Sequence, residues 1–218
     1  MSNKAGPSGG ELYVIAAPSG AGKTSLLRAL LAQLDHLALS VSDTTRPPRT
    51  GEVDGEQYHF IDVDAFRAGI DEDRYLEHAE VFGNYYGTDR ARVEALWAKG
   101  RSVLLEIDVQ GAAQIARQYP DACSIFILPP SMAVLAERLR NRRSDAEDVI
   151  RRRLSEARGE IEVCRDFSWM VVNDDFDTAL AQLIAIVTAW PQRRSRQNAH
   201  VQCLLDESAD GITIADYP

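Results

Sequence analysis

The segment APSGAGKT, residues 17–24, constrains the fold of this chain more than any other stretch of the sequence. It follows ELYVIAA at 11–17, a short apolar run whose β-branched and aromatic residues are typical of a buried strand. From Lys23 onward, leucines recur at helical spacing. We therefore expect a buried strand, a tight glycine-rich turn and a helix in direct succession. The leucines that define the helix are Leu26, Leu27, Leu30, Leu31 and Leu34.

This turn fits the phosphate-binding P-loop pattern G-x-x-x-x-G-K-[ST], except that Ala17 stands where the first glycine is usual. Backbone N–H groups of 19–24 can converge on a phosphate at the positive end of the helix dipole. Lys23 would then reach the β- and γ-phosphates of ATP, and the Thr24 hydroxyl would serve as a ligand of Mg²⁺. A chance glycine-rich turn is the alternative, and the flanking strand and helix argue against it. The residues predicted to bind ATP here are Pro18, Ser19, Gly20, Ala21, Gly22, Lys23, Thr24 and Ser25.

Strands alternate with helices along most of the chain. Three more apolar runs, at 102–108, 123–128 and 169–172, are each followed by a helical pattern. Such runs indicate a parallel sheet covered by helices on both faces, so the predicted fold class is a three-layer α/β P-loop domain. The turn-rich residues 42–90 interrupt the alternation as an insertion with short mixed strands. We predict a flexible tail at 1–10, a domain at 11–190 with its core at 11–41 and 91–190, and an extension of unknown role at 191–218.

Composition excludes several classes of function. The formal net charge of −9 argues against a broad nucleic-acid-binding face but leaves room for a local cationic pocket. No apolar run approaches the length of a membrane span, and the first ten residues lack the apolar centre of a signal peptide. The cysteines, Cys123, Cys164 and Cys203, are odd in number and widely spaced, which argues against a disulfide framework or a zinc site. A reducing compartment, the cytoplasm, is expected.

The polar residues 40–60 and two later segments indicate a family more specifically than the P-loop does. SVSDTTRPPRTGEVDGEQYHF at 40–60, EHAEVFGNYYGT at 77–88 and EIDVQG at 106–111 resemble guanylate kinases, which transfer phosphate from ATP to GMP. ILPPS at 127–131 and VVNDD at 171–175 extend the resemblance, which runs from about residue 11 to about 190. A chain of motifs in this order is far more specific than a P-loop alone.

The resemblance implies a GMP-binding site, and the chemistry of GMP explains its residues. Arg46 and Arg49 can hold the dianionic phosphate with fork geometry, although a solvated loop is the default interpretation of two such arginines. Glu77 would accept from N1–H and N2 of guanine, a pair of donors that adenine lacks. Taken alone, Glu77 could also be an exposed acid at a strand edge. The remaining implied GMP ligands are Tyr58 and Tyr86 at the phosphate, Asp108 at N2, and Ser42 and Thr88 at O6.

The arginine-rich residues 138–153 resemble the lid of this family. Arginines that arrive over the phosphates would stabilise negative charge on the transferred group and exclude water. A solvated basic helix is the alternative. The resemblance also puts Asn173 beside the adenine of ATP. The predicted catalytic residues are Lys23, Arg46, Arg138, Arg142 and Arg153.

The sequence thus predicts an enzyme of purine nucleotide metabolism that converts GMP, and dGMP, to the diphosphate with ATP and Mg²⁺. Its expected partners are ATP and GMP, with no nucleic acid and no membrane, and a homo-oligomer is left open. Two alternatives remain. A non-catalytic guanylate-kinase-like module that binds proteins would lack an intact P-loop, whereas Lys23 and Thr24 are present here. A P-loop kinase of another phosphorylated acceptor would not need the guanine-selective set around Glu77.

Overall fold

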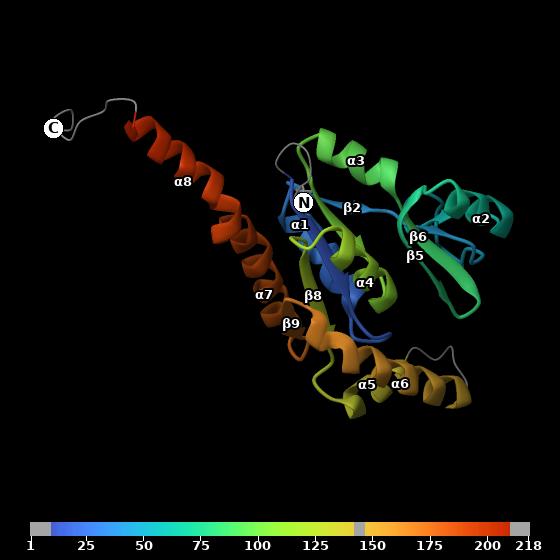
Figure 1. Ribbon diagram of the computed structural model, residues 1–218. Helices are drawn as coiled ribbons and strands as arrows, with labels where there is room; N and C mark the ends of the chain where they lie inside the picture. The colour runs from blue at the N-terminus through green and yellow to red at the C-terminus, as the bar shows by residue number, and fades with distance from the viewer. Residues whose placement is uncertain (1–9, 142–146, 210–218) are drawn as a thin grey trace.

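The computed structural model describes residues 10–141 and 147–209. Its centre is a five-stranded sheet in the order β2-β7-β1-β8-β9, and every neighbouring pair in it is parallel. Parallel strands need crossover connections, and here helices supply them on both sides (Figure 1). The strands are β1 (Leu12–Ala16), β2 (Leu37–Ser40), β7 (Ser102–Glu106), β8 (Cys123–Leu128) and β9 (Trp169–Val172).

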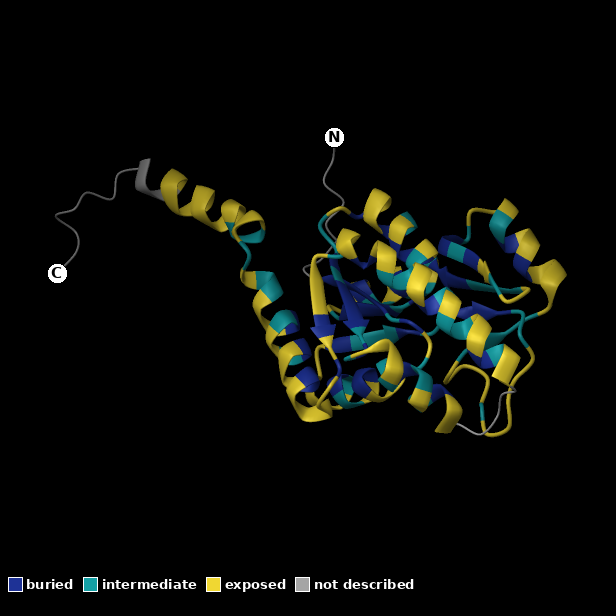
Figure 2. Ribbon diagram, turned by 90° about the horizontal axis from the view of Figure 1, so that it is seen from below, coloured by how far each residue is buried: buried dark blue, intermediate teal, exposed yellow. Residues whose placement is uncertain are grey.

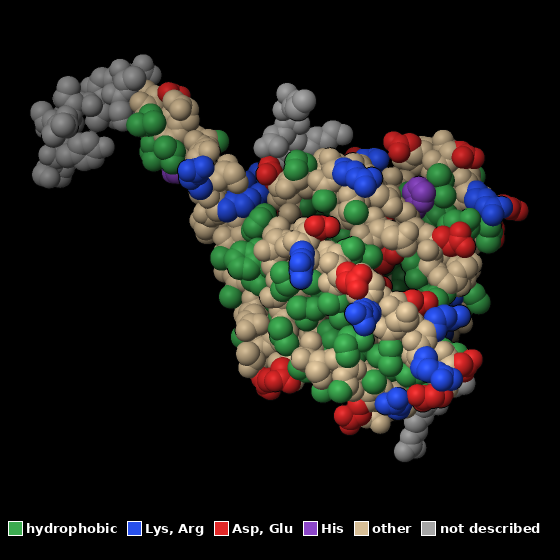
Figure 3. All heavy atoms as spheres, turned by 60° about the horizontal axis from the view of Figure 1, so that its bottom comes forward, with side chains coloured by type: hydrophobic (Ala, Val, Ile, Leu, Met, Phe, Trp, Pro, Cys, Tyr) green, Lys and Arg blue, Asp and Glu red, His purple; other side chains and the backbone are tan. Residues whose placement is uncertain are grey.

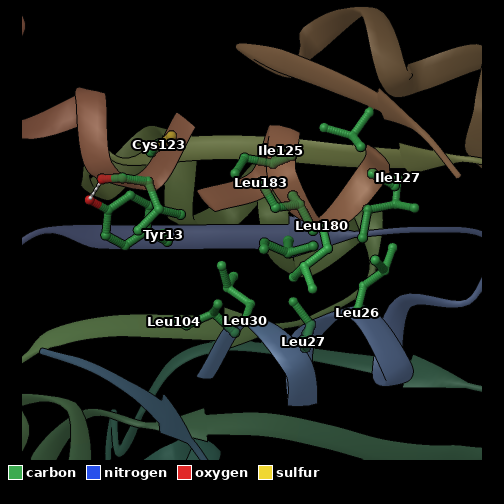
Figure 4. Close-up of a cluster of buried hydrophobic side chains, with 14 of the residues drawn as sticks. Tyr13, Leu26, Leu27, Leu30, Leu104, Cys123, Ile125, Ile127, Leu180 and Leu183 are labelled. Carbon is green, nitrogen blue, oxygen red and sulfur yellow. Dashed lines mark hydrogen bonds between the residues drawn. The ribbon is translucent and has the colours of Figure 1, made fainter. Parts of the chain in front are cut away.

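Two apolar clusters hold helices against the two faces of this sheet. Side chains of β1 alternate between them, since Tyr13 and Ile15 belong to one cluster and Leu12 and Val14 to the other. Helices α1 (Lys23–Gln33) and α7 (Phe176–Ala189) contribute leucines to the first cluster, which Figure 4 shows. Helices α3 (Arg90–Ala98) and α4 (Val109–Gln118) cover the opposite face. The predicted three-layer α/β fold with a parallel sheet is confirmed.

A second, smaller sheet lies within residues 43–89. Its order is β4-β3-β6-β5, and it mixes one parallel pair with two antiparallel pairs. Helix α2 (Val63–Asp71) packs on it through Phe66, whose ring stacks on Tyr75 and Tyr85. The strands are β3 (Asp43–Thr44), β4 (His59–Phe60), β5 (Tyr75–Val81) and β6 (Asn84–Asp89).

A buried carboxylate fixes this small sheet to its surroundings. Asp43 is fully buried and accepts hydrogen bonds from Arg74, Arg92 and the Tyr75 hydroxyl. Asp89 accepts a second bond from Arg74, at 2.7 Å. Buried charges need partners of this kind.

Helices α5 (Met132–Asn141) and α6 (Glu147–Glu162) form a pair beside the P-loop. Leu135, Leu139, Ile150 and Ala157 make a small apolar cluster between them. The short 3₁₀ helix η1 (Val163–Asp166) then leads into β9. The arginine-rich segment therefore spans the end of α5 and the start of α6. Its residues 142–146, including the predicted catalytic residue Arg142, lie outside the described residues.

Beyond α7, the 3₁₀ helix η2 (Trp190–Gln192) leads to α8 (Arg194–Ala209), which projects from the body (Figure 1). Most of its described side chains are exposed (Figure 2). At its base Glu11 pairs with Arg193 at 2.8 Å and with Arg196 at 3.0 Å, which joins the start of the described chain to the start of α8. Within the described part of the chain, no helix is both long and apolar enough to span a bilayer.

Candidate active site

The P-loop follows β1 directly, as the sequence predicts, and its shape depends on glycine at two positions. Gly20 and Gly22 have φ angles of 97° and 92°, which glycine adopts without strain. Gly22 is also the N-cap of α1, and a Cβ there would lie 2.3 Å from the amide nitrogen of Asn173. No side chain caps α1, and its first turn has no acidic residue, so its N–H groups face a site suited to an anion.

Lys23 and Thr24 meet the carboxyl end of β7. The Thr24 hydroxyl donates to Glu106 at 3.1 Å, and the Lys23 ammonium lies 3.8 Å from the same carboxylate oxygen. Lys23 also donates to the carbonyl of Ile107 at 3.4 Å. Sequence reasoning did not assign a role to Glu106, although an acid at the end of a predicted parallel strand was a usable signal.

Asn173 is buried behind the P-loop. Its side-chain amide donates to the backbone carbonyl of Ala21 at 2.7 Å, and the backbone carbonyl of Asn173 accepts from Arg138 at 3.0 Å. Neither Asn173 nor Arg138 lines the cavity described below. Their geometry indicates that they brace the P-loop from behind, while contact of Asn173 with adenine stays a prediction.

One cavity of about 770 Å³ joins the P-loop to the inserted sheet. Lys23 and Thr24 lie on its wall together with predicted GMP ligands and with Arg153 of α6. The predicted GMP ligands on the wall are Ser42, Arg49, Tyr58, Glu77, Tyr86 and Asp108. Wall residues that sequence reasoning did not assign are Ala79, Val81, Phe82, Glu106, Ile107 and Glu160.

Glu77 is the most deeply buried carboxylate of this wall, with 3% of its surface exposed. Burial raises its pKa to about 7; the hydrogen bond from Thr88 opposes this rise and the charge of Asp108 adds to it. The Thr88 hydroxyl donates to Glu77 at 2.6 Å, and Thr88 is fully buried and does not line the cavity, so it lies behind the carboxylate. Contact of Thr88 with O6 of guanine stays a prediction. Gly111 of α4 leaves the space that Glu77 occupies, because a Cβ there would lie 2.3 Å from Glu77 Oε2.

Asp108 lies at the start of α4 and caps it. Its carboxylate accepts from the N–H of Gly111 at 2.8 Å and from the side chain of Gln110 at 3.1 Å. Because a carboxylate has about four acceptor sites, capping leaves capacity for a ligand donor.

The two predicted phosphate arginines differ in their surroundings. Arg49 lines the cavity, whereas Arg46 makes two hydrogen bonds of 2.8 and 2.9 Å to Glu52 and is not on the cavity wall. The hydrogen bond from Arg46 holds the pKa of Glu52 below its ordinary value. Arg46 also lies over the ring of Tyr58, whose pKa burial raises to about 12, so Tyr58 presents a protonated hydroxyl donor. Glu52 was not predicted as a partner of Arg46.

The fold and this cavity define a class: a P-loop nucleotide-binding protein with a second ligand chamber beside the first. The chamber is walled by an inserted sheet that carries a buried carboxylate and aromatic hydroxyls. Lys23 of α1 and Arg49 of the insertion both line the cavity and give it cationic groups.

Comparison with known proteins identifies the family. The guanylate kinase family model matches residues 9–190. The chain is 53% identical to a guanylate kinase of Alkalilimnicola ehrlichii, over 86% of this chain and 93% of that protein. It is 50% identical to the guanylate kinase of Escherichia coli K12, over 91% and 97%. The crystal structure of guanylate kinase from Anaplasma phagocytophilum matches with a TM-score of 0.72 and 34% identity, over 87% and 90% of the two chains.

The chain therefore belongs to the guanylate kinase family. It is an enzyme, a kinase whose reaction is the ATP-dependent phosphorylation of GMP.

Proposed function

We propose that this cavity holds ATP and GMP at once and that the γ-phosphoryl group passes directly from one to the other. One observation carries the proposal: the P-loop residues and the guanine-selective residues line the same cavity of about 770 Å³. Direct transfer requires the donor and acceptor phosphates to meet in line, and a shared cavity allows this geometry.

The charge of the transferred group is stabilised by cations from three elements. Lys23 reaches the β- and γ-phosphates from α1, and Arg153 approaches from α6. Arg49 holds the acceptor phosphate with the hydroxyls of Tyr58 and Tyr86. Arg46 joins it when the GMP phosphate replaces Glu52 as its anionic partner. Arg138 supports the P-loop through Asn173, and Arg142 completes the proposed catalytic set.

Guanine is selected by acceptors on the wall opposite the P-loop. Glu77 accepts from N1–H and N2 in parallel, and Asp108 accepts from N2. Ser42 donates to O6, whereas Thr88 directs its hydroxyl to Glu77 and so orients the carboxylate. Adenine would leave Glu77 without its donors, which costs orders of magnitude in selectivity for sites of this kind. The same edge is present in dGMP, which we propose as a second substrate.

The oxygen ligands beside the P-loop suit Mg²⁺. Thr24 and Glu106 present a hydroxyl and a carboxylate 3.1 Å apart at the cavity, and hard divalent cations prefer such donors. Among the described residues, no group of three or more His, Cys, Asp or Glu side chains could hold a metal. When bound, Mg²⁺ neutralises charge that develops on the phosphates.

We place the enzyme in the cytoplasm, because all three cysteines are free and a reducing compartment keeps thiols in this state. ATP and GMP are its proposed partners. On the face shown in Figure 3, acidic and basic side chains are interspersed, whereas a nucleic-acid surface gathers basic ones. The expectation of no nucleic-acid partner stays a prediction, and the oligomeric state stays open.

ADP formation with GMP, dGMP, AMP, UMP and CMP in parallel tests the proposal. With ATP and Mg²⁺, turnover is expected with GMP and dGMP, and turnover with AMP is expected to be lower by about 10⁴ or more. Comparable turnover of AMP would contradict the guanine-selective wall. An inert protein would contradict the proposed reaction.

A further inference from the structure

Phe82 lies at the tip of the β5–β6 hairpin in a backbone conformation that rarely holds an aromatic residue. Its φ is 53° and that of Gly83 is 75°, so both central residues of the turn have positive φ. Turns of this type favour Asn-Gly or Asp-Gly, because a bulky residue is strained in the first central position. The Phe82 side chain is also 55% exposed. Core packing therefore does not explain a phenylalanine here, and strained residues of this kind are a reason to look for function.

The exposed ring has a partner on α6. The guanidinium carbon of Arg152, on α6, lies 5.3 Å from the centre of the Phe82 ring, within the range of a cation–π interaction. The Nε of Arg152 is 3.7 Å from a carboxylate oxygen of Glu156, one turn further along α6. Figure 1 shows the β5–β6 hairpin reaching toward this helix. The pair thus joins the inserted sheet to α6.

The neighbour of Arg152 in sequence is Arg153, which lines the cavity together with Phe82 and Lys23. The same position of α6 therefore gives both the Phe82–Arg152 contact and the placement of Arg153 at the cavity. An aromatic ring also attracts a guanidinium without adding a negative charge beside the phosphates. A carboxylate at residue 82 would oppose the cationic field that phosphoryl transfer needs.

We propose that Phe82 and Arg152 are positioning residues that hold α6 against the β5–β6 hairpin, so that Arg153 stays over the transferred phosphate. This inference rests on the role proposed above for Arg153. It assigns a use to the strained aromatic residue at the hairpin tip and to an arginine that does not itself touch a nucleotide.

Steady-state kinetics of Phe82→Leu and Arg152→Gln test the proposal. Each variant is expected to lower kcat by about two- to fivefold, the value of one exposed cation–π contact. The KM for GMP should change less than twofold, since neither side chain contacts guanine. Phe82→Tyr keeps the ring face and Arg152→Lys keeps the cation, so both should retain most of the activity. A role in folding alone would lower the melting temperature and would not produce this split between kcat and KM.

Arg158→Gln is a matched control on the same helix. Arg158 makes an i,i+4 ion pair with Glu162 at 3.7 Å, equal in length to the Arg152–Glu156 pair. Among the described residues, no aromatic ring lies beneath its guanidinium as Phe82 does for Arg152. Its kinetics should match the parent enzyme. A loss in Arg158→Gln equal to that in Arg152→Gln would overturn the inference.

The double variant Phe82→Leu with Arg152→Gln should lose no more activity than either single variant, because both remove one contact. Additive losses, or unchanged kcat in both single variants, would contradict the inference. Arg153→Gln separates this inference from the role on which it rests. If Arg153→Gln leaves kcat unchanged, the proposed role of Arg153 fails. If only Arg153→Gln lowers kcat, the positioning role fails and the role of Arg153 stands.

Discussion

The two sheets of this protein are stabilised in different ways. The five-stranded sheet is parallel, and the fully buried side chains of its central strands are almost all apolar. The inserted sheet is mixed and polar, and its centre contains the buried Asp43 with Arg74 and Arg92. The first presents backbone N–H groups at the P-loop, while the second presents side chains such as Glu77 and Tyr86.

This difference between the sheets matches what each ligand of the proposed site requires. A triphosphate is recognised mainly as charge, so a rigid strand–turn–helix with correctly aimed N–H groups suffices. A particular base must be recognised by the pattern of its edge, which requires individual side chains at fixed positions. An apolar sheet positions the first kind of site, and a network of hydrogen bonds and ion pairs positions the second. Five predictions test this comparison, from the largest expected effect to the smallest.

Lys23→Ala should remove phosphoryl transfer and leave the GMP chamber intact. Loss of a cation aimed at the developing charge is expected to lower kcat by roughly 10²–10³. Coupled measurement of ADP release checks the rate, and calorimetry checks GMP binding. GMP affinity should stay within a few-fold of the parent value. A large loss of GMP affinity in a folded variant would show that the two ends of the cavity do not act separately.

Asp43→Asn should weaken the inserted sheet far more than the central one. The change removes the charge of the buried carboxylate, while Arg74 and Arg92 keep Asp89 as a partner, and is expected to cost about 1–3 kcal/mol. Hydrogen exchange should show lost protection at 43–89, with β1 and β8 protected as before. Leu30→Ala is the contrasting variant, because loss of a core leucine, about 2–5 kcal/mol, should lower protection throughout. Equal losses everywhere in both variants would mean that the sheets unfold as one unit.

Glu77→Gln should lower GMP turnover by more than tenfold. An amide offers one acceptor oxygen and cannot accept two N–H groups in parallel as a carboxylate does. Turnover at several GMP concentrations in the ADP-release assay measures the effect, and the melting temperature serves as the folding control. Unchanged kinetics would remove Glu77 from the guanine site.

The pH dependence of GMP use should report the same carboxyl group. Burial raises the pKa of Glu77 to about 7, so the carboxyl becomes protonated, and a poorer acceptor, as pH falls through 7. We expect kcat/KM for GMP to fall by up to tenfold per pH unit below this value. Glu77→Gln should lose this dependence and keep only that of the GMP phosphate, with its pKa near about 6. A matched control is Glu160→Gln, since burial also raises the pKa of Glu160 to about 7. This variant should keep the pH dependence that Glu77→Gln loses.

The free energy of unfolding should also depend on the protonation of Glu77, but it should fall as pH rises, whereas kcat/KM for GMP should rise. The folded protein holds the proton of Glu77 up to about pH 7, whereas the ordinary pKa is 4.5. The folded state therefore binds more protons between these values, and the free energy of unfolding should fall as pH rises through this window. Glu77→Gln should flatten that part of the stability profile. A Glu77-dependent rise in stability over the window would contradict the raised pKa.

The sequence predicted the central sheet better than the inserted one, for a physical reason. Strands at 12–16, 102–106 and 123–128 are apolar runs, and burial on both faces makes such strands recognisable from composition. The edge strand at 169–172 is also an apolar run, although three of its four residues are exposed. β6, with the sequence NYYGTD, was not predicted as a strand, because its order comes from pairing with β5 and from the stacking of Tyr85. Helix α8 was not predicted either.

The candidate site shows the same limit. Motif resemblance identified Glu77, Asp108 and the P-loop, and the structure brings all of them to one cavity. It could not reveal that Glu52 holds Arg46, that Thr88 lies behind Glu77, or that Asn173 donates to Ala21. The first two contacts lie within one loop and one hairpin, and the third joins segments that are far apart in sequence. In none of the three does the spacing of the residues alone indicate the contact.

Gly111 lacks a Cβ atom, and this has a consequence for Glu77 beside it. The carboxylate of Glu77 occupies the volume that any larger residue at 111 would fill with its first side-chain carbon. Even alanine there would displace the carboxylate while leaving every ligand-facing residue unchanged in identity. If Glu77 selects guanine as proposed, that selection depends also on Gly111, a residue that has no side chain and would be overlooked in a survey limited to ligand contacts.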